Sequence, residues 1–442
     1  MNKNVFQKGG SIFELNGRPP FKQALPLALQ HVVAMIVGCV TPAIIVAGVA
    51  MGKGEMTADG KIMLVQSALL VAAIATLIQL FPLHKKVGSG LPVIMGVSFA
   101  YLASLQAIAT DYGVASIFGA QLIGGAAAVI VGIFITRLRK FFPPLVSGTV
   151  VFSIGLSLYP TAVNYMAGGK GSAEYGSWKN WLVAILTLVI VVCLNHFTTG
   201  FVKLASILIG MVSGYIVAFI LGMVDFTPVY DAGWFQISKP LYFGIQFDVP
   251  AIISIVILYI VNAVQAIGDL TATTEGGLDR EPTGDELSGG IIGSGLSSML
   301  GAFFGGLPTA TFSQNVGIVG TTKVVNRCVL GLSAVIILVA GLVPKFASLL
   351  TTIPSCVLGG ATVSVFASIT MTGIKLIAKG GLTPRNCSIV GLAVALGMGI
   401  TQVPEALAQF PSWVTMIFGK SAVVVATILA ISLNILIPNK DS

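Results

Sequence analysis

The chain has 442 residues, of which 55% are hydrophobic and only 9% are charged, and its mean hydropathy is +0.95. A soluble domain carries about 25% charged residues, so this composition excludes one and indicates a membrane protein built from apolar helices. The formal net charge of +8 requires no nucleic-acid partner, because basic residues gather on the inner side of membrane proteins and contact anionic lipid there.

Apolar runs divided by polar or charged segments predict about fourteen membrane-spanning helices. Polar and glycine-rich positions interrupt the third and the tenth of them, and the 52 glycines and 20 prolines of the chain suit broken helices and close helix packing. In chain order the predicted spans are 24–50, 62–82, 91–109, 116–136, 143–160, 181–197, 201–224, 249–273, 287–304, 309–326, 328–349, 354–374, 384–402 and 419–437.

The basic residues predict the orientation of these helices. With the N-terminus inside and an even number of spans, most of the 24 lysines and arginines fall on the inner side. We therefore expect a multi-pass protein of the cell (inner or plasma) membrane with both termini in the cytoplasm. Residues 1–23 are polar and lack a cleavable apolar core, which predicts insertion through the first span without a signal peptide.

The sequence lacks the motifs that several classes of function require. The five cysteines stand mostly within predicted spans without CxxC spacing, so they predict neither a disulfide framework nor a metal site. The sequence contains no Walker A motif and no long polar segment, which argues against ATP-driven transport. It shows neither a nucleophile–base pair nor a metal cluster, so we expect no enzyme activity, no metal and no cofactor.

The two halves of the chain repeat the same signals. Gly90-Leu91-Pro92 opens the third predicted span and Gly306-Leu307-Pro308 opens the tenth, while Pro143 and Pro354 open the fifth and the twelfth. The spacing suggests two repeats of about seven spans each, which an odd span number makes inverted. A proline removes a backbone donor, so two such breaks facing each other near the midplane present N–H groups to a polar solute.

The segment Ser313–Lys323 reads Ser-Gln-Asn-Val-Gly-Ile-Val-Gly-Thr-Thr-Lys and is the most informative part of the chain. Hydrocarbon tolerates irregular polar backbone only where it is buried in protein or lines a cavity. Gln314 and Asn315 therefore predict either a binding site at a broken helix or an interhelical hydrogen-bond clamp. One side-chain amide offers both a donor and an acceptor, which suits the adjacent C=O and N–H groups of a nucleobase.

Titratable groups are few. Asp269 ends the eighth predicted span one turn after Gln265, and an acid at membrane depth is either a proton carrier or a structural hydrogen-bond centre. His31 in the first span could also titrate near neutral pH. Lys323 is expected to anchor the inner end of its helix, with its ammonium group at the interface, and not to bind a ligand.

The pattern Gln-Asn-x-Gly-x-x-x-x-Thr-Lys, together with Gln30-His31, Gly268-Asp269 and Arg18-Pro19-Pro20, resembles the nucleobase–ascorbate transporter family over nearly the whole chain. The Gln at 314 resembles the purine branch, because the uracil branch typically has Glu there. The resemblance implies secondary active uptake of a purine base (xanthine, hypoxanthine, guanine or urate) by proton symport, through an elevator-type movement of a homodimer. The alternatives are a uracil or ascorbate transporter, and an anion exchanger or channel of the same fold.

The resemblance also implies a division of the chain and a set of site residues. The N-terminal segment 1–23 and the tail 438–442 would be cytoplasmic, 24–141 and 245–350 would form a core domain, and 142–244 and 351–437 a gate domain. Phe99 would offer a ring face to a flat heterocycle, the alternative being ordinary packing. The implied substrate-binding residues are Gln314, Ser313, Gln265, Phe99 and Ala100, and the site-shaping or coupling residues are Asp269, His31, Asn315 and Ser294.

The chain departs from this family at two positions. Many members carry Glu where Gln265 stands, and many carry Asp near Ser294. Both residues are neutral here, which leaves Asp269 and His31 as candidates for proton coupling. Sodium coupling therefore stays open as an alternative to proton symport.

Overall fold

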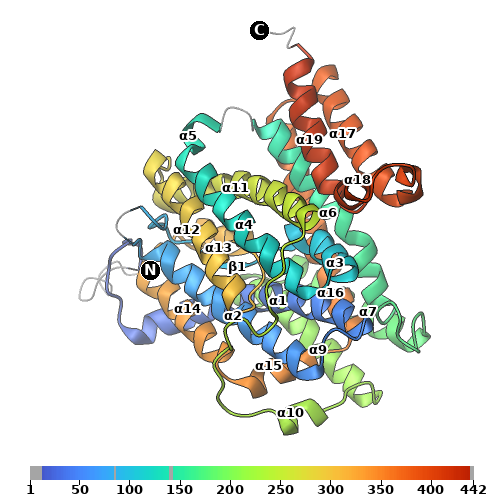
Figure 1. Cartoon of the computed structure of the whole chain (residues 1–442). Coiled ribbons are helices and arrows are strands. Elements are labelled where there is room, and N and C mark those ends of the chain that lie inside the picture. Colours follow the sequence, from blue (N-terminus) through green and yellow to red (C-terminus); the bar gives the residue numbers. More distant parts are fainter. Residues whose placement is uncertain (1–11, 84–85, 139–142, 439–442) are drawn as a thin grey trace.

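The structure is a computed structural model that describes residues 12–83, 86–138 and 143–438 (Figure 1). Parts of four predicted regions lie outside the described residues: 1–11 of the N-terminal segment, 84–85 and 139–141 of the first core segment, 142 of the first gate segment, and 439–442 of the tail. The described chain is mostly helical.

The elements follow one another as long helices interrupted twice by a short strand. In chain order they are α1 (Phe21–Gly52), α2 (Ala58–Leu80), β1 (Met95–Val97), η2 (Phe99–Tyr101), α3 (Leu102–Asp111), α4 (Val114–Ile133), α5 (Ile135–Leu138), α6 (Pro144–Met166), α7 (Trp178–Phe197), α8 (Gly200–Leu204), α9 (Ser206–Ile220), α10 (Thr227–Asp231), α11 (Val249–Leu278), α12 (Gly284–Phe303), β2 (Thr309–Thr311), α13 (Ser313–Thr322), α14 (Arg327–Gly341), α15 (Pro344–Thr351), α16 (Ser355–Lys379), α17 (Pro384–Gln402), η4 (Pro404–Leu407), α18 (Ser412–Phe418) and α19 (Ala422–Leu436).

Several of these helices have the length and composition of membrane spans. Within the described residues seven helices qualify: α1, α2, α4, α6, α7, α11 and α16. Helices α14 and α15 meet at an angle of 83°, and counting this bent pair as one span raises the number to 8. The count is smaller than the predicted number of about fourteen. Two predicted spans, 91–109 and 309–326, contain a strand and short helical segments, and α9 and α19 are apolar but short.

The helices pack in two groups. In the first helix group (α1–α4 and α11–α15, with both strands), α4 packs on α11 and α12, and α14 packs on α1 and α2. In the second helix group (α6, α7, α9, α16, α17 and α19), α6 packs on α16 and α19, and α7 packs on α9 and α16. Figure 1 shows α17 and α19 at one end of the molecule, far from α2 and α14. Contacts between the two groups are sparse compared with contacts within them.

The two strands join parts of the chain that are far apart in sequence. β1 and β2 pair antiparallel, with Gly96 opposite Ala310. The pairing continues beyond the strands, because Ser98 N donates to Pro308 O at 3.0 Å and Phe312 N donates to Ile94 O at 2.9 Å. Both strands are fully buried. Each strand thus satisfies backbone groups of the other where no water is available.

Two glycines make room for the residue that follows β2. A Cβ atom on Gly38 of α1 would lie 2.4 Å from Phe312 Cε1, and one on Gly96 of β1 would lie 2.2 Å from Phe312 Cε2. Neither position therefore admits a side chain while the ring stays in place. The ring of Phe312 holds α1, β1 and the start of α13 at a fixed distance from one another.

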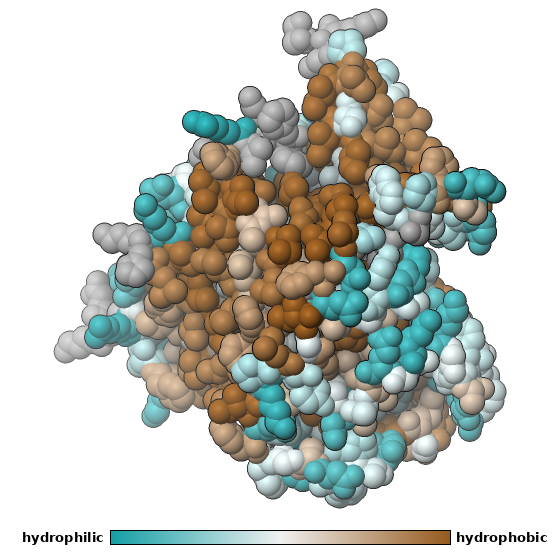
Figure 2. Space-filling view, viewed as in Figure 1, coloured by the Kyte–Doolittle hydropathy of each residue, from teal (hydrophilic) through white to brown (hydrophobic). Residues whose placement is uncertain are grey.

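The surface of the molecule suits contact with lipid. Figure 2 shows a broad hydrophobic face over the region where Figure 1 places α4, α11 and α12, with hydrophilic residues toward its edges. Large apolar side chains such as Ile130 and Ile133 on α4, and Ile185 and Val189 on α7, are about half exposed. Soluble monomers rarely expose contiguous apolar faces of this kind, so the chain is a multi-pass membrane protein that uses them against the bilayer.

Candidate functional site

A cavity of about 640 Å³ lies between the two helix groups. Its first wall comes from α11, β2, the start of α13 and the residues after β1. Its second wall comes from α6 and α16. Six residues predicted from the sequence line this cavity: Gln265, Asp269, Ser313, Gln314, Phe99 and Ala100. The structure thus brings together residues from three distant parts of the chain.

Asp269 is the hydrogen-bond centre of the first wall. Thr311 Oγ1 donates to Asp269 Oδ2 at 2.5 Å, and Ser313 Oγ donates to Asp269 Oδ1 at 2.8 Å. Asp269 is 9% exposed, and Gln265 lies one turn before it on α11 and lines the same cavity. The carboxylate therefore ties α11 to the end of β2 and to the first residue of α13.

The start of α13 supplies polar groups to the cavity. Its N-cap residue, Phe312, gives no side-chain hydrogen bond to the helix. The first turn of α13 therefore keeps backbone N–H groups that can donate to a ligand. Ser313 is exposed toward the cavity and Gln314 is half-buried there. Such a helix N-terminus, with its positive end and one amide side chain, can bind carbonyl and N–H groups of a neutral heterocycle.

The second wall is more apolar and its hydroxyl groups are already committed. Val151 and Ile154 of α6 and Val365 and Ile369 of α16 line it. The hydroxyl groups on α16 donate to carbonyl groups of their own helix, Ser368 Oγ to Ser364 O at 2.9 Å and Thr372 Oγ1 to Ser368 O at 2.9 Å. These oxygens retain only acceptor capacity toward a ligand.

His31 and Asn315 form a clamp away from the cavity. Asn315 Nδ2 donates to His31 O at 3.1 Å and lies 3.1 Å from His31 Nδ1. Both residues are buried and neither lines the cavity. The clamp joins α1 to α13, which is the arrangement that the alternative interpretation of Asn315 predicts. Ser294, on α12, is buried and also lies outside the cavity lining.

Other residues of the site escaped the sequence analysis. Thr311 donates to Asp269, and Phe366 of α16 meets Phe99 edge to face at 5.2 Å between ring centroids. Glu275 and Lys379, both exposed, line one end of the cavity from opposite walls. The position of Thr311, two residues before Ser313 after the Gly-Leu-Pro break, was a usable signal. Nothing in the local sequence marks Phe366 or Lys379.

Lys323 lies at the end of α13 and not in the cavity. Its ammonium group pairs with Asp279 Oδ1 at 2.8 Å, and both residues adopt left-handed backbone angles at the ends of their helices, α13 and α11. This position agrees with the predicted anchoring role. Within the described residues, no group of three or more His, Cys, Asp or Glu side chains could hold a metal ion.

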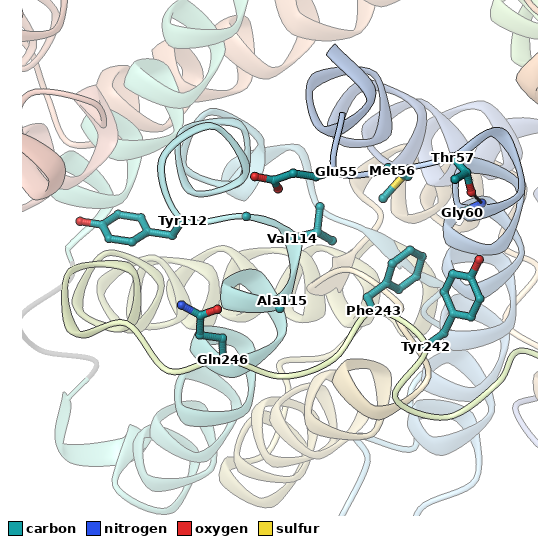
Figure 3. Close-up of a pocket in the computed structure, with 11 residues that line it drawn as sticks. Glu55, Met56, Thr57, Gly60, Tyr112, Val114, Ala115, Tyr242, Phe243 and Gln246 are labelled. Carbon is teal, nitrogen blue, oxygen red and sulfur yellow. Dashed lines mark hydrogen bonds between the residues drawn. The ribbon is translucent and has the colours of Figure 1, made fainter. Parts of the chain in front are cut away.

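A second cavity of about 520 Å³ lies among the loops that join α1 to α2, α3 to α4, and that precede α11. Figure 3 shows Glu55, Tyr112, Phe243 and Gln246 around this space. Among the described residues, Glu55 is the single charged residue that lines it, and none of the residues predicted for the site is present. The buried polar groups and the strand pair belong to the first cavity, so we take that cavity as the candidate site.

Comparison with known proteins gives a consistent picture. A sequence profile described as "Permease family" matches residues 22–406. The xanthine permease of Bacillus subtilis is 38% identical over 426 residues, covering 95% of this chain and 94% of that protein. Uric acid permease PucK of the same organism is 35% identical over 422 residues (95% and 96%), and xanthine permease XanQ of Escherichia coli is 33% identical over 444 residues (97% and 94%).

Solved structures share the fold at low sequence identity. The transmembrane domain of the cyanobacterium bicarbonate transporter BicA aligns with a TM-score of 0.59 and 15% identity, covering 93% of this chain and 98% of that one. SLC26A9 aligns with a TM-score of 0.63 and 9% identity, covering 95% of this chain and 66% of that one. These likenesses concern the arrangement of the chain alone.

Proposed function

Because the chain belongs to the nucleobase–ascorbate transporter family of permeases, we propose that it takes up a purine nucleobase by secondary active transport. The substrate class comprises xanthine, hypoxanthine, guanine and urate. One observation carries the proposal: Gln314, Ser313 and the carboxylate of Asp269 meet at the start of α13, in a cavity that Phe99 also lines. Relatives at 33–38% identity that are named xanthine or uric acid permeases support the substrate class.

In this proposal each group binds one feature of the base. The side-chain amide of Gln314 pairs with an adjacent carbonyl and N–H of the heterocycle, and the first N–H groups of α13 donate to its carbonyl oxygens. Phe99 packs on the ring face, and Gln265 supplies a further amide one turn before Asp269. His31 and Asn315 hold α1 against α13, so they shape the site without touching the substrate. Ser294 is assigned to packing around the site.

Transport requires the site to face each side of the membrane in turn. We assign the first helix group to the moving core (24–141 and 245–350) and the second to the gate (142–244 and 351–437). The pairing of two broken segments through β1 and β2 supports an inverted repeat. We keep about fourteen spans and cytoplasmic termini as part of the proposal because of the apolar runs and the distribution of basic residues in the sequence. The sparse contacts between the groups suit an elevator-type movement of one against the other, in a homodimer.

Asp269 is the proposed proton carrier. In the part of the chain that the structure describes, it is the one carboxylate buried in the lining of this cavity, and Gln265 cannot titrate where many family members carry Glu. A proton on Asp269 would change its bonds to Thr311 and Ser313, which hold the start of α13. Proton loading would thus alter the substrate-binding wall itself.

An anion exchanger of the same fold is the second candidate, because the structural neighbours include a bicarbonate transporter. Its site would need a cationic group at the helix breaks. Lys379 is the lysine of the cavity lining and stands at the mouth, while two carboxylates, Asp269 and Glu275, line the same cavity. Two carboxylates against one lysine disfavour a small inorganic anion such as bicarbonate.

The test is ligand binding to the purified protein. Purines, uracil, ascorbate, bicarbonate and sulfate are compared by the shift in thermal unfolding, since a ligand at a hundredfold excess over its Kd stabilises by about 2.7 kcal/mol. We expect a purine to give the largest shift, and Gln314→Ala to weaken its binding about tenfold to a hundredfold because a buried polar edge stays unpaired.

Gln246→Ala is the matched control, because Gln246 is exposed and lines the second cavity instead. It should leave purine binding unchanged. Wild-type affinity in Gln314→Ala would remove this residue from the site. A larger shift with bicarbonate or sulfate than with any purine would replace the proposed function by the anion alternative.

A further inference from the structure

The two ends of the candidate cavity differ in exposure: Phe99 at one end is buried, whereas Glu275 and Lys379 at the other are exposed, and we call them the closed end and the open end. The cavity follows α16 from Val365 to Lys379 and α6 from Ile154 back to Pro144. At the open end, Glu275 and Lys379 are exposed on opposite walls and form no ion pair with any described residue. At the closed end the helix groups meet directly.

Contacts at the closed end begin with a ring pair and continue outward. Phe99 and Phe366 are both buried and meet edge to face. Beyond them, polar contacts bridge the two helix groups: Thr161 Oγ1 to Gln106 Oε1 at 3.3 Å, Tyr165 OH to Ile45 O at 3.5 Å, and Lys420 Nζ to Asp111 Oδ2. The chain runs from Phe99 through η2 and α3 to Asp111, so the ion pair lies at the end of α3 that points away from the cavity.

We propose that the ion pair between Asp111 and Lys420 is a latch that keeps this end of the cavity closed and that opens when the cavity faces the other side of the membrane. The inference rests on the proposed transport function. Asp111 belongs to the first helix group, and Lys420 lies two residues before the first residue of α19, which belongs to the second. Any relative movement of the groups that opens the closed end must separate these two charges.

The energetic role of such a pair differs from its role in folding. The side chains of Lys420 and Asp111 are 35% and 30% exposed, and a pair in contact with water contributes little to folding stability. A contact that is present in one access state and absent in the other nevertheless shifts the equilibrium between these two states by its whole net free energy. For a partly exposed pair this corresponds to a change of about two- to fivefold in the population ratio.

The chain contains a matched control. Lys323 and Asp279 form a similar exposed pair, but both belong to the first helix group, at the ends of α13 and α11. Their separation does not change when the two groups move as units. Neutralising this pair removes the same charges without touching the closed end.

The experiment measures access to the cavity directly. Ser368→Cys, which places a thiol in the cavity lining, is introduced into a chain whose five natural cysteines are replaced by alanine. Its labelling by an impermeant maleimide is followed in right-side-out and in inside-out vesicles, without any nucleobase present. In the parent chain we expect labelling mainly from the side of Lys379, the inner side under the proposed topology.

Lys420→Gln and Asp111→Asn should each raise the rate of labelling from the opposite side about two- to fivefold. A double variant that swaps the two charges, Asp111→Lys with Lys420→Asp, should return the labelling rate toward that of the parent chain. Asp279→Asn should leave the labelling rate unchanged. Unchanged labelling in both latch variants, or an equal rise in Asp279→Asn, overturns the latch. Since the assay uses no substrate, failure of purine binding would refute the proposed function and leave this result standing.

Discussion

The two walls of the candidate cavity hold their polar groups in different ways. On the first wall, Asp269 accepts from Thr311 and Ser313, which belong to two other elements. On the second wall, Ser368 and Thr372 donate to carbonyl groups of α16 itself. A change at one position of the first wall therefore disturbs several elements, whereas Ser368 and Thr372 of the second wall are paired within their own helix. We infer that the first wall recognises substrate and the second wall closes over it.

The largest effect is expected at the centre of the first wall. Asp269→Asn replaces an acceptor by an N–H₂ group, so one of the two hydroxyl donors loses its partner, which lowers the unfolding free energy by about 1–3 kcal/mol. Reconstituted protein should no longer concentrate labelled purine under an imposed proton gradient, while purine exchange across the membrane persists.

Asp279→Asn, on an exposed residue outside the cavity, is the control for this substitution. Accumulation should be measured under a proton gradient and then under a sodium gradient. If Asp269→Asn still concentrates purine with protons alone, the residue braces the wall and carries no proton.

A smaller effect on purine affinity is expected for the two rings that meet between the walls, and it should differ between them. Phe99 lines the cavity, whereas Phe366 is fully buried behind it. Phe99→Leu should weaken purine binding by about 0.5–1.5 kcal/mol, because an aliphatic side chain lacks the ring face. Phe366→Leu removes the same ring pair but should leave the Kd unchanged. Equal losses of affinity, measured by titration calorimetry, would show that the ring pair acts as a unit.

The smallest effect is expected on the second wall. Ser368→Ala removes a hydroxyl whose proton is already donated to Ser364 O, so purine affinity should change by no more than about 0.5 kcal/mol. Thr372→Val should behave alike. An affinity loss as large as that of Gln314→Ala would contradict the contrast between the walls and assign recognition to both.

The sequence predicted much of the first wall because its signals are local. The Gly-Leu-Pro break, the Gln-Asn pair and an acid one turn after Gln265 each report chemistry that hydrocarbon disfavours. These signals singled out Gln314 and Asp269, the family resemblance added Ser313, and all three line one cavity in the structure. They also left Asn315 undecided between ligand and clamp, and its bond to His31 favours the clamp.

Local sequence signals could not predict the second wall or the number of continuous membrane-spanning helices. Phe366 stands in an apolar run where any large residue would pack, so its contact with Phe99 depends on how the two helix groups meet. The division of 91–109 and 309–326 into strand and helix likewise depends on pairing between distant segments. Long-range pairing leaves no periodicity in either partner alone, which is why the predicted spans overstate the continuous helices.

The pairing of β1 with β2 has a consequence for the biogenesis of the protein. The strands are separated by roughly two hundred residues of chain, so this contact closes late during synthesis. Met95 N donates to Thr76 Oγ1 of α2 within the first half of the chain. Until β2 emerges from the ribosome, however, the backbone groups of β1 that face β2 lack their partners, and lipid offers no hydrogen bond in their place. The first half of the chain therefore needs water or an assisting protein beside residues 95–97 while the second half is being made. A truncated chain that ends before β2 should accordingly be recognised and degraded as unfinished, even with its early helices already inserted.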